Sequence, residues 1–85
     1  MRVECLFALY PLGRQTHMDA IYGSIERARA DGRVTVTPVH FATRLDGDLG
    51  DVLNVIRTAF DEAGAGHVVV HATISKGSPS KESQS

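Results

Sequence analysis

The chain has 85 residues, 42% of them hydrophobic, with nine Lys and Arg against ten Asp and Glu and a formal net charge of −1. This length supports one domain with one small core, and pairing with a second copy would bury more of its surface. The balanced charge excludes the basic face that a dedicated nucleic-acid-binding protein needs, and no apolar run approaches the length of a membrane span.

Cysteine usage and the N-terminus indicate the compartment. The single cysteine, Cys5, has no internal disulfide partner and is expected as a small buried apolar residue in a reducing environment. The first residues, Met1 to Glu4, are charged and lack the apolar stretch of a signal peptide. We therefore expect a cytoplasmic protein with no membrane partner.

Residues 3–9 predict the first strand. Alternation separates its side chains into two sets, Val3, Cys5, Phe7 and Leu9 on one side and Leu6, Ala8 and Tyr10 on the other. Because both sets are largely apolar, we expect this strand in the middle of a sheet.

The first helix is predicted from its two ends. Thr16 is a suitable N-cap residue, with Asp19 three positions later, and Gly32 supplies a left-handed C-cap. Tyr22 falls on the apolar stripe between these ends and is expected in the core.

The next segment predicts a hairpin and a second helix. Residues 34–37 alternate and are β-branched, and Pro38 marks an edge strand or its end. A return strand is expected over residues 42–45, followed by a turn at Asp46 and Gly47. Asp48 then caps the second helix, with Asp51 in its first turn. The stripe expected to face the core is Leu49, Val52, Leu53, Ile56, Ala59, Phe60 and Ala63.

Residues 67–74 predict the last strand, with Val68, Val70, Ala72 and Ile74 on one side. Residues 1–75 therefore form a single domain, and residues 76–85 are expected as a disordered polar tail. The order β-α-β-β-α-β predicts an α+β, ferredoxin-like sandwich in which two helices cover one face of an antiparallel sheet.

The opposite face of this sheet is bare in a monomer. It is expected to present the apolar and polar side chains of Leu6, Ala8, Tyr10, Val69, His71 and Thr73. An apolar patch of this kind indicates a partner or a ligand. Self-association as a homodimer or homotetramer is the simplest explanation.

No pattern in the chain predicts catalysis. A small phosphatase of the acylphosphatase type needs an arginine in the first loop and a strand asparagine; Arg14 meets the first requirement, but the only asparagine, Asn54, lies mid-helix. An RNA platform needs several exposed aromatic residues on central strands, and Tyr10 is alone. His67 and His71 would lie roughly 13 Å apart on a strand, too far to share a metal. We expect no enzyme, no metal and no cofactor.

Several segments together resemble one family. They are Phe7 to Leu12, Thr37-Pro38 with Thr43, the Asp46-Gly47-Asp48-Leu49 sequence with Val52, and the apolar run 67–70. In this order and spacing they resemble the small YkoF-like thiamine-binding proteins over nearly all of residues 3–75. Ala8 stands where a serine is common in that family.

The resemblance implies non-catalytic binding of thiamine or its hydroxymethylpyrimidine half, as a carrier or sensor. A flat aminopyrimidine needs an apolar slot with a few polar groups. The candidate contacts are Tyr10 for stacking, Thr43 for a hydroxyl, Asp46 for the amino group or thiazolium charge, and His71 and Thr73 for lining. Tyr10 is equally suited to interface packing and Thr43 to a plain strand position. The alternative function is a structural or regulatory oligomerisation module without a small-molecule ligand.

Overall fold

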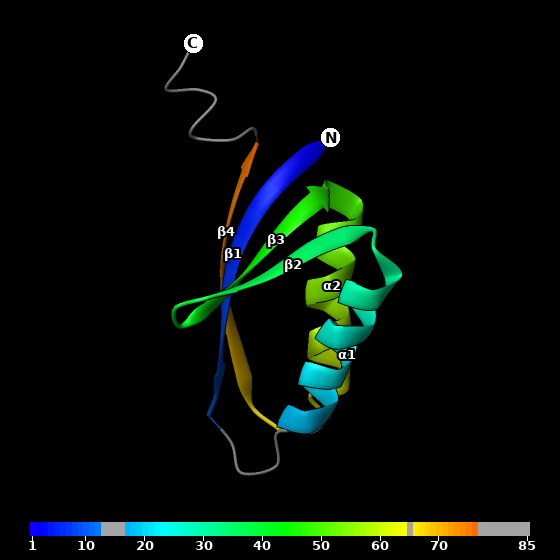
Figure 1. Ribbon diagram of the computed structural model, residues 1–85. Helices are drawn as coiled ribbons and strands as arrows, with labels where there is room; N and C mark the ends of the chain where they lie inside the picture. The colour runs from blue at the N-terminus through cyan, green and yellow to red at the C-terminus, as the bar shows by residue number, and fades with distance from the viewer. Residues whose placement is uncertain (13–16, 65, 77–85) are drawn as a thin grey trace.

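The computed structural model describes residues 1–12, 17–64 and 66–76. Its elements follow the predicted order and are β1 (Arg2–Pro11), α1 (Met18–Asp31), β2 (Val34–Val39), β3 (Ala42–Asp48), α2 (Leu49–Glu62) and β4 (Val68–Lys76). The strands form one sheet in the order β2-β3-β1-β4, and each neighbouring pair is antiparallel. Figure 1 shows α1 and α2 together on one side of the sheet, which confirms the ferredoxin-like fold.

Local signals explain where the first helix ends. Gly32 adopts the left-handed conformation at φ 82°, and its amide donates a hydrogen bond to the carbonyl of Ala28 at 3.4 Å, as predicted for a glycine C-cap. The N-cap position is His17, which makes no side-chain capping hydrogen bond. The predicted cap at Thr16 lies outside the described residues.

The junction between β3 and α2 is more direct than predicted. Gly47 lies within β3 rather than in a turn, and Asp48 is both the last strand residue and the N-cap of α2. A Cβ atom on Gly47 would lie 3.0 Å from the backbone oxygen of Arg33, so the close approach of two backbones favours glycine here. The turn predicted at Asp46 and Gly47 is therefore wrong. Glycine here allows β3 to pack closely against the start of β2, so the strand continues to Asp48.

Asp48 holds two segments together at this junction. Its Oδ2 atom accepts a hydrogen bond from the amide of Gly50 at 3.1 Å, and its Oδ1 atom accepts one from the Met1 ammonium group at 2.9 Å. The hydrogen bond from the ammonium group, followed by that from Gly50, holds the pKa of the Asp48 carboxyl below its usual value. The predicted cap is confirmed, and it also fixes the start of β1 beside the start of α2.

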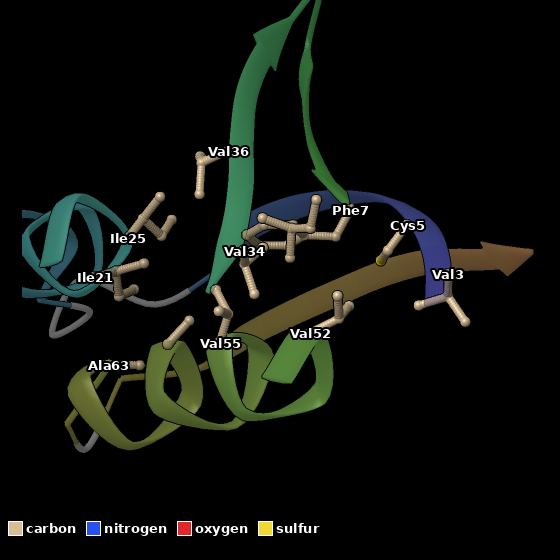
Figure 2. Close-up of a cluster of buried hydrophobic side chains, with 12 residues drawn as sticks. Val3, Cys5, Phe7, Ile21, Ile25, Val34, Val36, Val52, Val55 and Ala63 are labelled. Carbon is tan, nitrogen blue, oxygen red and sulfur yellow. The ribbon is translucent and has the colours of Figure 1, made fainter. Parts of the chain in front are cut away.

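The hydrophobic core lies between the sheet and the helices. Figure 2 shows side chains of β1 and β2 pointing toward those of α1 and α2. The fully buried large side chains are Ile21, Leu45, Val52 and Cys5. Burial raises the pKa of the Cys5 thiol, as expected for a cysteine in an apolar core. Among the described residues, no side chain of β4 belongs to the buried set.

Three side chains predicted for the core are exposed. Tyr22 is 59% exposed, and Leu53 and Phe60 are each 45% exposed, whereas Val55 is buried although the predicted stripe omitted it. Val55 borders the groove against α1, so the buried surface of α2 is rotated toward the neighbouring helix. For Leu53 and Phe60 the prediction is wrong because the apolar stripe of α2 is wider than the surface that the sheet and α1 cover. For Tyr22 it is wrong because this residue borders an open hollow beside α1.

The two edges of the sheet differ in length. β2 is one edge, as Pro38 predicted, and β4 is the other. β4 continues to Lys76, one residue beyond the predicted end of the domain, because Lys76 still pairs with Val3. Neither α1 nor α2 combines the length and the apolarity that crossing a membrane would take.

Candidate functional site

The face of the sheet opposite the helices carries four of the five predicted contact residues. On this outer face the strand register places Tyr10 beside Val69, and His71 beside Ala8. Thr73 lies beside Leu6, which pairs with Arg44 on its other side. Three large apolar side chains of this face are exposed, namely Leu6, Tyr10 and Val69.

The outer face divides into an apolar end and a polar end. Tyr10 and His71 are diagonal neighbours across the β1–β4 pair at the apolar end. Asp46 pairs with Glu4, which is six residues from Tyr10 along β1, or roughly 20 Å at about 3.3 Å per residue. Tyr10 and Asp46 therefore do not border one small-molecule pocket.

An arginine bound by two carboxylates dominates the polar end. Arg44 Nε donates to Asp46 Oδ2 at 2.9 Å and Arg44 Nη2 donates to Asp46 Oδ1 at 3.2 Å. Arg44 Nη2 also lies 3.4 Å from Glu4 Oε2. The hydrogen bond and charge of Asp46, with a smaller contribution from Glu4, raise the pKa of the Arg44 guanidinium. Both oxygens of Asp46 thus accept hydrogen bonds from within the protein.

Thr43, the fifth predicted contact, lies on the other side of the sheet. It pairs with Phe7, whose side chain is buried beneath the helices, so alternation directs Thr43 toward the helix layer. There it borders an open hollow of about 310 Å³ between α1 and the β2–β3 hairpin, which we call the α1–hairpin cleft. The cleft is lined by Phe7, Ala8, Leu9, Ile21, Tyr22, Ile25, Val39, Phe41, Ala42 and Thr43.

The cleft combines an apolar wall with groups suited to a flat ring. Thr43 supplies a hydroxyl, and Tyr22 supplies an exposed aromatic ring with a phenol. Small-molecule sites are typically concave and mostly apolar, with a few polar groups and volumes from about 300 Å³ upward. Most residues that line the cleft are apolar in type, and its volume lies at the lower end of this range.

Phe41 is the residue of this site that the sequence patterns missed. It ends the two-residue turn between β2 and β3 with φ 61°, and it is 89% exposed. Its ring lies edge-on against His40, with ring centroids 4.0 Å apart. A bulky residue in the left-handed region costs conformational energy, so such residues concentrate at functional positions. The sequence feature that could have identified Phe41 is the two-residue turn His40-Phe41, which lacks the glycine or asparagine usual in such turns.

A second hollow of about 290 Å³ lies between the two helices and is polar. Arg27 binds Glu62 at 3.3 Å, and Arg33 binds Asp31 at 3.3 Å, so both arginines at this groove have acidic partners. Asn54 lies here, whereas Arg14 lies outside the described residues. Within residues 1–12, 17–64 and 66–76, no group of three His, Cys, Asp or Glu side chains is placed to hold a metal ion.

The sequence matches the model of the YkoF-related family over residues 2–81. It is 34% identical over 82 residues to YkoF of Bacillus subtilis strain 168, a protein named as a candidate HMP/thiamine-binding protein. That alignment covers 94% of this chain and 40% of YkoF, so the chain spans about two fifths of the length of that relative.

Solved structures share the fold. A protein of Streptococcus pneumoniae superposes with a TM-score of 0.71 at 19% identity, covering 99% of this chain and 96% of that one. A Thermotoga maritima protein, described as a candidate thiamine biosynthesis or salvage protein, superposes with a TM-score of 0.61 at 11% identity. That superposition covers 99% of this chain and 97% of the other.

Proposed function

Because the chain belongs to the YkoF-related family, we propose that it binds thiamine or its hydroxymethylpyrimidine half without changing the ligand chemically. The observation that carries the proposal is the α1–hairpin cleft, an open hollow of about 310 Å³ that is lined mostly by apolar residues, with Thr43 in its wall and the exposed rings of Tyr22 and Phe41 at its border. The names of the Bacillus and Thermotoga proteins point to the same class of ligand.

The chemistry of an aminopyrimidine suits this cleft. Its flat ring buries both faces against apolar and aromatic side chains, while ring nitrogens and the amino group each need a hydrogen-bonding partner. The Thr43 hydroxyl both donates and accepts, so it pairs with either kind of group. No nucleophile and base are needed for this role, which suits a carrier or a sensor.

The outer face has a separate role in this proposal. Tyr10, His71 and Thr73 accompany exposed Leu6 and Val69 there, and this surface suits self-association of the bare sheet face as a dimer or tetramer. Asp46 accepts two hydrogen bonds from Arg44 and forms part of the polar end of the same face.

Titration calorimetry with hydroxymethylpyrimidine and with thiamine tests the proposal. Thr43→Val removes the hydroxyl with little change in shape, and we expect it to weaken binding by roughly 3- to 10-fold, the worth of one hydrogen bond. Phe41→Gly retains a turn with positive φ and removes the ring, with a similar expected loss. Thr35→Val, at an exposed position on β2 away from the cleft, is the matched control and should bind as wild type.

The contrary outcomes separate the alternatives. If Tyr10→Ala or His71→Ala abolishes the heat of binding while Thr43→Val retains it, the ligand binds to the outer face and not in the cleft. If neither compound gives a heat of binding, the alternative is favoured, an oligomerisation module without a small-molecule ligand. Turnover of an acyl phosphate would instead indicate a small hydrolase.

A further inference from the structure

The turn between β2 and β3 places an aromatic residue in a conformation that suits glycine. Among the described residues other than glycine, only Phe41 has a positive φ. A two-residue turn with positive φ at its second central residue alone has the φ pattern of type II, which favours Gly or Asn at that position. Hairpins are more often closed by types I′ and II′, whose twist matches that of the strands. His40-Phe41 is therefore a poor sequence for the turn that it forms.

Little of the chain itself holds Phe41 in this conformation. A strained backbone persists where surrounding contacts compensate for the strain. Phe41 is almost fully exposed, and the ring contact that it makes is with its own neighbour, His40. Figure 1 shows the tip of the hairpin projecting beyond β1, on the side away from the helices. The compensating contact is therefore expected from a group outside the chain.

The α1–hairpin cleft is the place where such a group can lie. Phe41 borders the cleft from the hairpin, and the exposed Tyr22 borders it from α1. Phe7 and Ile21, which are buried, form part of its lining between these two walls. The cleft is open, whereas a small-molecule site commonly buries about 70–90% of the surface of its ligand. A flat ring that lies against this lining needs a further side chain over its outer face.

We propose that Phe41 is an aromatic lid: when a flat heterocycle enters the α1–hairpin cleft, the tip of the hairpin moves toward α1 and the Phe41 ring covers the outer face of the ligand. This inference rests on the proposed function, because the lid needs a ligand in that cleft. Aromatic rings stack favourably on flat heterocycles, and a turn that no packing holds in place moves readily.

A small molecule is a better occupant for Phe41 than a second protein chain. The residues that Phe41 accompanies line a concave hollow of about 310 Å³, the shape and size of a small-molecule site. The neighbouring edge of β2 offers little to a protein partner. Thr35 and Thr37 are polar and exposed there, and Pro38 has no amide to donate.

Stability and binding should respond to Phe41 in opposite directions. Phe41→Asn removes the ring and supplies a residue that tolerates positive φ. We expect the melting temperature of the free protein to rise by roughly 4 °C. We also expect hydroxymethylpyrimidine to dissociate roughly 3- to 10-fold faster, because the stacked ring is gone. Thr37→Asn, at an exposed position of β2, is the control and should change neither quantity in this direction.

A tryptophan at the tip of the hairpin reports the closure itself. The chain contains no tryptophan, so Phe41→Trp introduces a single reporter that retains an aromatic ring. With saturating hydroxymethylpyrimidine we expect its emission to shift to shorter wavelengths and its quenching by acrylamide to fall at least twofold. Thr35→Trp, on β2 away from the cleft, should show neither change. Calorimetry on the same two variants measures binding independently of the fluorescence.

The outcomes separate the lid from the proposed function. If calorimetry detects binding while the tryptophan of Phe41→Trp stays equally accessible, the lid is overturned and the proposed function stands. If neither the wild type nor Phe41→Trp gives a heat of binding, the proposed function fails and the lid fails with it. An emission shift that follows protein concentration without ligand would assign Phe41 to a contact between copies and overturn the lid. A lower melting temperature for Phe41→Asn would show that the ring stabilises the free turn, which also contradicts the proposal.

Discussion

β1 and β4 lie side by side, pair along most of their length and both alternate apolar residues, yet they differ sharply in burial. The helix-facing side chains Cys5 and Phe7 on β1 are 0% and 2% exposed, whereas Ile74, the register partner of Cys5, is 42% exposed. The alternation of a strand specifies which side is apolar. Whether that side is covered depends on where the helix layer ends, and here it covers Val68 and Val70 in part but leaves Ala72 and Ile74 exposed.

The largest expected effect follows directly from this contrast. Phe7→Ala removes a buried ring from the centre of the sheet and should lower the free energy of unfolding by about 3–5 kcal/mol. Ile74→Ala should cost less than about 1 kcal/mol at protein concentrations that keep the chain monomeric, because its side chain is half solvated there. Urea denaturation of both variants, at low micromolar concentration, measures the difference. Equal losses would show that β4 is covered within the single chain.

A second pair of variants contrasts close packing with open space. A Cβ atom on Gly47 meets the backbone oxygen of Arg33 at 3.0 Å, and such crowding costs about 1–3 kcal/mol. Alanine also lowers the conformational entropy of the unfolded chain, which stabilises the protein by about 0.4–1 kcal/mol. We therefore expect Gly47→Ala to lower the free energy of unfolding by about 1 kcal/mol in total.

Gly23→Ala is the matched control for this variant. Its Cβ atom would meet only the end of the Arg27 side chain, at 3.5 Å, within α1. Here the better helix propensity of alanine should stabilise the protein by about 0.5–1 kcal/mol. Thermal melts of the two variants should therefore shift in opposite directions. A shift of both in the same direction would contradict the close approach at Gly47.

The parts of this molecule that were predictable are those that neighbouring residues determine. Gly32 and Asp48 mark helix ends because their own backbone and side chain satisfy the terminal hydrogen bonds. The order of the elements, and the exposed apolar outer face, follow from alternation and spacing alone. These features together fix the ferredoxin-like fold.

The parts that were not predictable depend on partners distant in the sequence. Leu53 shares an apolar stripe with buried residues, but the sequence does not state how wide the covering surface is. Thr43 was grouped with outer-face residues, and only its register with Phe7 shows that it faces the helices. Phe41 was missed because a single turn residue in the left-handed region leaves no periodic pattern. Of the contact residues predicted from the sequence, only Thr43 therefore lines the candidate cleft.

The smallest expected effect concerns the acidic cap where the packed part of the sheet meets α2. The pKa of the Asp48 carboxyl is lower in the folded protein because the Met1 ammonium and the Gly50 amide donate to it. A carboxyl with a depressed folded pKa contributes stability above its unfolded pKa of about 3.9 and loses that contribution as pH falls through its folded value. Asp48→Asn keeps an N-cap acceptor but has no charge to lose.

The wild type should therefore be more stable than Asp48→Asn at pH 7, and this advantage should shrink steadily below about pH 4. Urea midpoints at pH 7, 4 and 2.5 measure it. Asp51→Asn serves as the control in the same first turn, since that carboxylate is not the N-cap of α2. An advantage that persists undiminished at pH 2.5 would mean that capping geometry, and not the charge shared with the start of β1, stabilises this end of the sheet.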